Sequence, residues 1–268
     1  MTIVVEVLCV GNELLSGITL NTNAHWLAAQ VAGAGGTINR ITVVGDDISA
    51  ISTAVKEALA RKPAILITTG GLGTTYDDMT LEGMATALSR RAILDKRAVR
   101  MLKDSYARRN LHYRINKVRL KMATIPEGST PIENPVGTAP SVAIDARGAK
   151  VFCVPGVPVE MKAVFKNHVL PLIKDSVGAF VSKEANYMVS GVSEAMIAPA
   201  LKNIVGSNPT HAIYLKTHPQ GYFKKMTPRI RVQIVSKGND IKDVEKRLAR
   251  ISRQLLGQIR KLGGKLLQ

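Results

Sequence analysis

We predict from the sequence an α/β protein, with a three-layer domain around a mostly parallel sheet followed by a small α+β domain. Two observations support this prediction. Apolar runs alternate with helically spaced apolar stripes from the first residues onward, as expected for parallel strands joined by helices. This alternation stops near Asp175 to Glu184, beyond which a strand with one polar face is found. We therefore place the two domains at residues 1–175 and 185–268.

The first part of the chain supplies three strands and two helices of the predicted domain. Val4 to Val10 is a buried strand that ends at Gly11, and a helical stripe follows over residues 24–32. Ile41 to Val44 is the second strand, and residues 51–59 give the next stripe. A third strand, Ala64 to Thr69, runs directly into a glycine-rich loop. Since parallel strands present their carboxyl ends at one edge, we expect the ligand site there.

The later elements complete this domain. A basic helix over Asp95 to Arg109 is expected to be an exposed excursion rather than part of the core, because it is rich in Arg and Lys. Residues 142–144 and 151–154 form a predicted pair of strands around a turn at Arg147-Gly148. Glu160 to Ile173 is the predicted closing helix.

The tail reads as a small sheet with helices. We expect strands at residues 187–190, 212–216 and 229–235, and a helix at residues 194–204. Apolar and polar residues alternate strictly in the last of these strands, which predicts one wet face. The stripe from Ile241 to Ile259 predicts a long helix, and we favour packing on this sheet over a coiled-coil partner.

Composition and charge narrow the class of protein. The sequence shows no basic leader and no apolar run of about 20 residues, so we expect a cytoplasmic protein without a membrane contact. Cys9 and Cys153 lie in apolar runs and are expected to be buried thiols. The net charge is +17, and residues 90–122 and 173–268 carry +10 and +11, so the remaining residues are net −4. We interpret the positive charge as a solvated surface, with a nucleic-acid-binding surface as the less favoured alternative.

The glycine loop is the strongest local feature. Thr69 is followed by Gly70, Gly71 and Gly73, with Thr75 a little further on. Glycines allow a phosphate to approach the backbone closely, and amides at such a turn can bind it. The acidic pair Asp77-Asp78 that follows would repel a bare phosphate. We therefore expect a divalent cation that bridges the carboxylate and phosphate oxygens. The alternative is a tight turn in which Asp78 caps the next helix.

Two more strand ends carry polar residues. Gly45-Asp46-Asp47 follows the second strand, and Gly11-Asn12-Glu13 follows the first. Either aspartate could instead cap the helix that begins near Ile48, and that alternative stays open here. The convergence of three polar strand ends at one sheet edge is the argument for a site.

Short blocks of this kind follow one another through residues 4–173. They are Gly11 to Gly17, Thr22-Asn23, Val44 to Asp47, Thr69 to Gly73 with Asp77-Asp78, Asn134 to Pro140, and Val154 to Pro158 with Glu160-Met161. In content and order they resemble the signature blocks of the CinA family. That resemblance implies a molybdopterin-binding-type domain, as in the MoaB, MogA and MoeA proteins, followed by a small KH-like domain.

The resemblance also implies roles for individual residues. Asp46 and Asp78 would be catalytic and would hold a divalent metal, Mg²⁺ or alternatively Mn²⁺ or Co²⁺, with Asp77, Glu13 and Glu82 as further ligand candidates. Substrate and phosphate would be bound by Gly70, Gly71, Gly73, Thr75, Asn12, Gly137 and Gly156. The implied activity is hydrolysis of an ADP-ribose-like or FAD-like dinucleotide, a small-molecule substrate. A homodimer or higher homo-oligomer is the expected assembly.

Departures from the family pattern limit what is carried over. Thr74 and Asn21 stand where the family usually has Pro and Asp, and no amidohydrolase domain follows, so deamidase activity is not expected. Residues 173–268 contain no Gly-x-x-Gly, the loop that clamps nucleic acid in KH domains. Two alternatives therefore remain: a molybdopterin-binding or adenylyltransferase factor, and a non-enzymatic nucleotide sensor or nucleic-acid-associated module.

Overall fold

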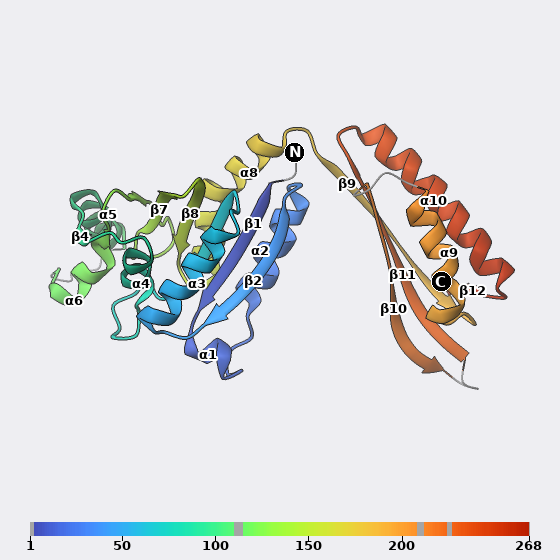
Figure 1. The fold of residues 1–268 in the computed structure, drawn as a ribbon, viewed down its shortest axis with the longest axis horizontal. Helices are drawn as coiled ribbons and strands as arrows, with labels where there is room; N and C mark the ends of the chain where they lie inside the picture. Colours follow the sequence, from blue (N-terminus) through green and yellow to red (C-terminus); the bar gives the residue numbers. More distant parts are fainter. Residues whose placement is uncertain (1–2, 110–114, 208–211, 224–226, 268) are drawn as a thin grey trace. The chain divides into compact units, whose positions relative to one another are not determined.

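The computed structural model describes residues 3–109, 115–207, 212–223 and 227–267 (Figure 1). The chain divides into two compact units, Met1–Val177 (unit 1) and Gly178–Gln268 (unit 2). Unit 1 is built on a six-stranded, mostly parallel sheet and unit 2 on a four-stranded antiparallel sheet. The predicted fold class is thereby confirmed.

The sheet of unit 1 has the strand order β2-β1-β3-β8-β7-β6. Its first four strands are parallel neighbours, and β7 and β6 are added antiparallel. The strands are β1 (Val4–Val10), β2 (Thr37–Val44), β3 (Ile65–Thr69), β6 (Thr130–Ile132), β7 (Ser141–Ala146) and β8 (Ala149–Val154). The carboxyl ends of the four parallel strands therefore meet at one edge, as expected from the alternation of elements.

Helices cover both faces of this sheet. One face packs against α2 (Thr22–Gly33), α7 (Pro158–Val164), the π-helical turn η2 (Phe165–Val169) and α8 (Leu170–Val177). The other packs against α3 (Ile48–Ala60), α4 (Thr80–Ala87) and α5 (Lys96–Arg108). Smaller elements are α1 (Asn12–Leu15), β4 (Ala92–Leu94), α6 (Lys117–Leu120), the 3₁₀ turn η1 (Lys121–Ala123) and β5 (Thr124–Pro126).

The side chains of β1 show how one strand serves two cores. Val7 and Cys9 face the α2 layer, whereas Leu8 and Val10 face the α3 layer. Glu6 is a charged residue inside this apolar run and is only 2% exposed. Arg61, at the end of α3, donates Nε to Glu6 Oε1 at 2.9 Å and Nη2 to Oε2 at 2.8 Å. This two-point pair satisfies the buried carboxylate, which would otherwise be costly.

The cysteines are buried and unpaired, as predicted. Burial raises the pKa of the Cys153 thiol to about 12, and it also raises the pKa of Cys9. Both side chains therefore remain neutral thiols at neutral pH and pack as small hydrophobic groups.

The basic helix α5 differs from its prediction. It was expected to be an exposed excursion, but Ala98, Leu102 and Tyr106 are buried, and Leu102 and Tyr106 belong to the core beside α3 and α4. Its Arg and Lys residues occupy the opposite, solvent-facing side. The prediction considered only the charged residues, which lie on one face of α5. The apolar residues repeat at helical spacing on the other face, and that face packs in the core.

Unit 2 contains β9 (Val181–Ser190), α9 (Glu194–Gly206), β10 (Ile213–Phe223), β11 (Thr227–Gly238), α10 (Ile241–Lys261) and β12 (Lys265–Leu267). The sheet order is β10-β11-β9-β12, and every neighbouring pair is antiparallel. This β-α-β-β-α-β arrangement is the ferredoxin-like, or split β-α-β, topology. The sequence predicted the α+β class but not this strand order, and β9 already begins within the expected linker.

Both helices of unit 2 lie on the same side of its sheet (Figure 1). Ile197 of α9 and Ile251 and Leu255 of α10 pack on Ile230, Val232 and Ile234 of β11, the residues whose alternation was noted in the sequence. The wet face predicted for β11 is therefore the face of the sheet opposite these helices. Within the described parts of the chain, no helix combines the length and apolar character needed to cross a bilayer.

Candidate active site

A cleft of about 260 Å³ opens at the carboxyl ends of β1, β2 and β3. Four acidic residues line it, together with two glycines of the β3 loop and polar groups from the start of α2. The acids are Glu13, Asp46, Asp77 and Asp78. The strand ends that the sequence singled out thus contribute to one concave surface, the acidic cleft.

The glycine loop has a backbone that other residues could hardly adopt. Gly70 and Gly71 have φ values of 106° and 66°. A Cβ atom at Gly70 would lie 2.2 Å from the carbonyl oxygen of Val10, so β1 and the loop are in direct backbone contact. Thr80, the first residue of α4, also holds the loop, because its hydroxyl donates to the Gly70 carbonyl oxygen at 2.7 Å. The loop is therefore fixed to both flanking elements before any ligand arrives.

Asp78 folds back on the loop instead of capping α4. The backbone N–H of Thr75 donates to Asp78 Oδ2 at 2.8 Å, and the Thr75 hydroxyl donates to the same oxygen at 2.5 Å. Met79 occupies the N-cap position of α4 and makes no side-chain cap. The capping alternative for Asp78 is thus not what the structure shows. Thr75, which was predicted to contact phosphate, orients this carboxylate.

Asp46 and Asp47 have separate tasks. Asp47 caps α3, because its Oδ1 accepts from the Ala50 N–H at 2.8 Å, and this bond lowers the pKa of Asp47. Asp46 turns toward the cleft and is held by Asn12, whose N–H donates to Asp46 Oδ2 at 2.7 Å. The Asp46 N–H donates in return to Asn12 Oδ1 at 3.3 Å. Asn12 therefore connects the ends of β1 and β2 and positions the cleft aspartate.

Asn23 links the carboxyl ends of β3 and β8. Its Nδ2 donates to the Gly156 carbonyl at 2.7 Å and to Thr69 Oγ1 at 3.2 Å, and Thr69 Oγ1 donates to the Pro155 carbonyl at 2.8 Å. A Cβ on Gly156 would lie 3.2 Å from Gly70 Cα. The glycine of the Pro-Gly-Val-Pro block therefore keeps two backbones close at the floor of the cleft. Asn23 was not predicted as a site residue, although its Thr22-Asn23 block was a signal.

A second cleft, of about 500 Å³, adjoins the first. The two share Gly71, Asp78 and Gly156, and the second is walled by Tyr106, Arg119 and Glu160 among others. The Arg119 guanidinium carbon lies 5.8 Å from the centre of the Tyr106 ring, a cation–π distance. Tyr106 and Arg119 come from the basic residues 90–122, and Tyr106 lies on the helix that was expected to stand outside the core, so sequence reasoning missed this wall of the cleft.

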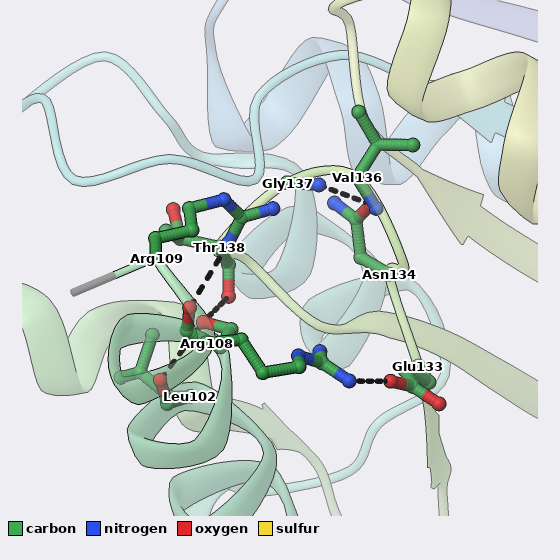
Figure 2. A network of polar contacts seen from close by, with 9 residues as sticks. Leu102, Arg108, Arg109, Glu133, Asn134, Val136, Gly137 and Thr138 are labelled. Carbon is green, nitrogen blue, oxygen red and sulfur yellow. Dashed lines mark hydrogen bonds and ion pairs between the residues drawn. The ribbon is translucent and has the colours of Figure 1, made fainter. Parts of the chain in front are cut away.

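The loop that borders the second cleft is held by a polar network (Figure 2). Asn134 Oδ1 accepts from the Gly137 N–H at 2.7 Å, while its Nδ2 donates to Glu160 Oε2 at 2.7 Å. A Cβ on Gly137 would collide with the Glu160 carboxylate, which explains the glycine. Figure 2 shows the end of α5 joined to the same loop through the Arg108–Glu133 ion pair. Gly137 thus leaves room for Glu160 and helps to fix the loop beside the second cleft.

The predicted residues therefore divide into groups. Those that line the acidic cleft together are Glu13, Asp46, Asp77, Asp78, Gly70, Gly71, Thr75 and Gly156. Gly73 lines the second cleft, and Asn12 and Gly137 support the walls. Glu82 lines neither cleft but a small hollow that shares Gly71 and Asp78 with both of them. Its role as a metal ligand stays a prediction.

The donors in the acidic cleft suit a hard divalent cation in a particular way. Among the residues that the structure describes, no three acidic, His or Cys side chains converge as a ready-made metal site. Mg²⁺ is commonly held by only one or two carboxylates plus substrate phosphates and waters. Asp46 and Asp78 line the same cleft and are the residues that would hold such an ion, with the ligand completing its coordination shell.

Comparison with known proteins places this fold and site in a family. Residues 6–175 match the family model described as a probable molybdopterin binding domain. The chain belongs to this family. The matched segment contains both clefts and every element of unit 1 that forms them, so the molybdopterin-binding-type domain and unit 1 coincide closely.

The chain is also similar to whole-length relatives and to solved structures. A protein of Metallosphaera sedula is 37% identical, covering 97% of this chain and 96% of the relative. A protein of Sulfurisphaera tokodaii is 38% identical, covering 98% and 97%. The crystal structure of CinA from Thermoplasma acidophilum, a protein of unknown function, is 39% identical with a TM-score of 0.59, covering 64% of this chain and 98% of that one. The resemblance to the CinA family is thereby confirmed.

Proposed function

We propose that the molybdopterin-binding-type domain binds a phosphorylated pterin of the molybdopterin class across its two clefts. The observation that carries the proposal is the junction of the clefts at Gly71, Asp78 and Gly156, which puts the glycine loop between them. The family match supports the ligand class. Arg119, whose guanidinium lies over the buried Tyr106 ring, gives the second cleft a planar cationic wall, which suits a flat heterocycle.

The acidic cleft adds a requirement to this proposal. Four carboxylates beside the glycine loop disfavour a bare anion, so we propose that the ligand binds together with Mg²⁺ or a similar ion at Asp46 and Asp78. When bound, such an ion supplies charge neutralisation and polarises phosphoryl oxygens. The protein's own contribution is to hold the carboxylates in place through Asn12 and Thr75 and to present loop amides to the phosphate.

Ligand fluorescence tests the binding proposal directly. Titration with molybdopterin should give saturable binding that requires Mg²⁺ and is lost on chelation. Replacing Arg119→Gln should weaken binding about fivefold through loss of the cationic wall. The matched control Arg100→Gln changes the same charge on the exposed side of α5 and should leave the affinity unchanged. Equal losses in both variants would remove the second cleft from the proposal.

A second candidate is metal-dependent hydrolysis of an ADP-ribose-like or FAD-like dinucleotide. Two observations favour it: Asp46 and Asp78 line one cleft with the glycine loop, and the chain resembles CinA. In this proposal the two clefts take the two halves of the dinucleotide, and the diphosphate lies at their junction. Water attacks one phosphorus atom, and the bond from that phosphorus to the bridging oxygen breaks. The bridging oxygen stays with the other phosphate, the attacking water releases a proton to solvent, and the products are AMP and a second phosphate ester.

Release of AMP from ADP-ribose with Mg²⁺, Mn²⁺ or Co²⁺ distinguishes this candidate from simple binding. Asp78→Asn should lower the rate at least about 100-fold, because even an outer-shell change at a metal site costs 10- to 100-fold. Asp145→Asn, an exposed aspartate on β7, is the matched control. Transfer of AMP from ATP to molybdopterin, without hydrolysis of ADP-ribose, would instead identify an adenylyltransferase.

A further inference from the structure

The sheet of unit 2 has one face that its helices leave uncovered. Strand register decides which residues lie there, because residues directly opposite in antiparallel strands share a face. Ile230, Val232 and Ile234 pack under α9 and α10, so Arg229, Arg231 and Lys237 of β11 point to the other side. Lys216 is paired with Gln233, and Lys265 with Ser190, which itself pairs with Arg229.

These five cations, Lys216, Arg229, Arg231, Lys237 and Lys265, define what we call the basic sheet face. Lys216, Arg231 and Lys265 are exposed. Glu184 is an acidic residue on the same face, and it already accepts hydrogen bonds from Gln233 Nε2 at 2.9 Å and Asn186 Nδ2 at 2.6 Å. The face therefore keeps a strong positive charge that complements a polyanion.

The groups between the cations favour a nucleic-acid partner. Asn186 Nδ2 and Gln233 Nε2 both donate to Glu184 Oε1, and His218 Nε2 lies 3.2 Å from Gln233 Oε1, so a chain of polar contacts crosses three strands. Amides of this kind can hydrogen-bond to base edges. Tyr214, on the same face, is 47% exposed and offers a ring on which a base can stack. An anionic membrane surface would favour protruding apolar side chains for insertion. The described apolar residues on this face, Met188, Val235 and Leu267, are only partly exposed, whereas the amide of Asn186 is exposed.

The shape of the face selects single strands over duplexes. Four neighbouring strands make a platform about 15 Å wide, too broad to enter the major groove of a duplex. Single strands can lie across such a platform with their bases splayed on it, which is how four-stranded sheets of RNA-recognition modules bind. We propose that the basic sheet face of unit 2 binds single-stranded nucleic acid, with Lys216 and Arg231 contacting phosphates and Tyr214 stacking on a base.

Fluorescence anisotropy of the full chain tests this proposal with labelled oligouridylate and oligodeoxythymidylate of about 15 nucleotides. Binding should weaken as salt rises from about 50 to 200 mM, and the two probes show whether RNA or DNA is preferred. In the double variant Lys216→Gln/Arg231→Gln, the slope of log affinity against log salt should become shallower by about 1.4, since each single-strand phosphate contact contributes about 0.7. Tyr214→Ala should weaken binding about fivefold or more.

The matched control is Lys246→Gln/Arg253→Gln, which removes the same charge from exposed positions of α10 on the other side of unit 2. It should leave affinity and salt slope unchanged. Equal losses in the two double variants, equal affinity for a duplex of the same length, or binding only to vesicles of anionic phospholipid would each overturn the proposal. Circular dichroism melting checks that the variants are folded, and the single change Arg231→Gln is the milder substitute if the double variant is not.

Discussion

At the scale of single residues, adjacent carboxylates in this chain act differently because the backbone turns between them. Asp47 accepts a hydrogen bond from the first turn of α3, while Asp46 is turned to the cleft by Asn12. The sequence predicted that the strand ends would meet, since parallel strands share an edge. The sequence left open which aspartate caps α3, because both are aspartates and both lie just before the helix.

Replacing Asp47→Ala should lower the midpoint of urea unfolding at neutral pH, whereas Asp47→Asn, which can still cap, should lower it less. The pKa of Asp47 is lowered in the folded protein, mainly by the Ala50 N–H. Its contribution to stability is therefore present above the unfolded pKa and is lost as pH falls through the lower folded pKa. The difference between the wild type and Asp47→Ala should shrink in acid; a constant difference from neutral pH to about pH 2 would contradict this account.

Gly70 and Gly257 offer a matched comparison of one substitution. Gly70→Ala should destabilise the protein by at least about 1–3 kcal/mol, because φ is positive and a Cβ would meet the Val10 carbonyl. Gly257→Ala, inside α10 with open space around its Cβ position, should stabilise by about 0.5–1 kcal/mol. Denaturant unfolding of both variants measures the effects, and a neutral Gly70→Ala would mean that the loop is not held against β1.

At the scale of elements, the strongly patterned segments were predicted and the weakly patterned ones were not. β1 and β3 are apolar runs bounded by glycine and were placed closely. β2 begins at Thr37 rather than Ile41, because Asn39 and Arg40 of this edge strand carry no apolar signal. β12 has three residues, too few for periodicity, and without it the topology of unit 2 could not be derived.

The second cleft shows another limit of sequence reasoning. Tyr106, Arg119 and Glu160 come from three separate segments, α5, α6 and α7, and no local spacing relates them. They meet because α5 packs in the core and its end is joined to the loop at Asn134 to Ala139. Tertiary packing brings these segments together to form the second cleft. A single sequence does not show which distant segments will pack against one another.

The hairpin between β7 and β8 provides a test at this scale. Its two central residues, Arg147 and Gly148, have φ values of 50° and 82°, as in a type I′ turn. Arg147→Asn should stabilise unit 1 by about 0.5–1 kcal/mol, since Asn tolerates this conformation better than Arg. Gly148→Ala should have the opposite sign. Urea unfolding measures both, and destabilisation by Arg147→Asn would show that the Arg side chain has a role beyond the turn.

At the scale of the whole molecule, each unit has its own core. The two clusters beside the large sheet belong to unit 1, and the third lies under α9 and α10. A chain ending at Val177 should therefore fold, keep the ligand binding of the acidic cleft, and lose single-strand binding. Scanning calorimetry of the full chain should show the transition of this fragment plus a second one. Loss of ligand binding in the folded fragment would mean that unit 2 contributes to the site.

The two edge strands of the large sheet affect how copies of the protein can assemble. Its outer strands are β2, with Arg40 at its centre, and β6, which is three residues long and contains Pro131. Proline has no N–H to offer an incoming strand, and a charged outer strand discourages alignment with another copy. Both edges therefore disfavour strand pairing between copies, which favours association through helices or side-chain surfaces and works against cross-β growth.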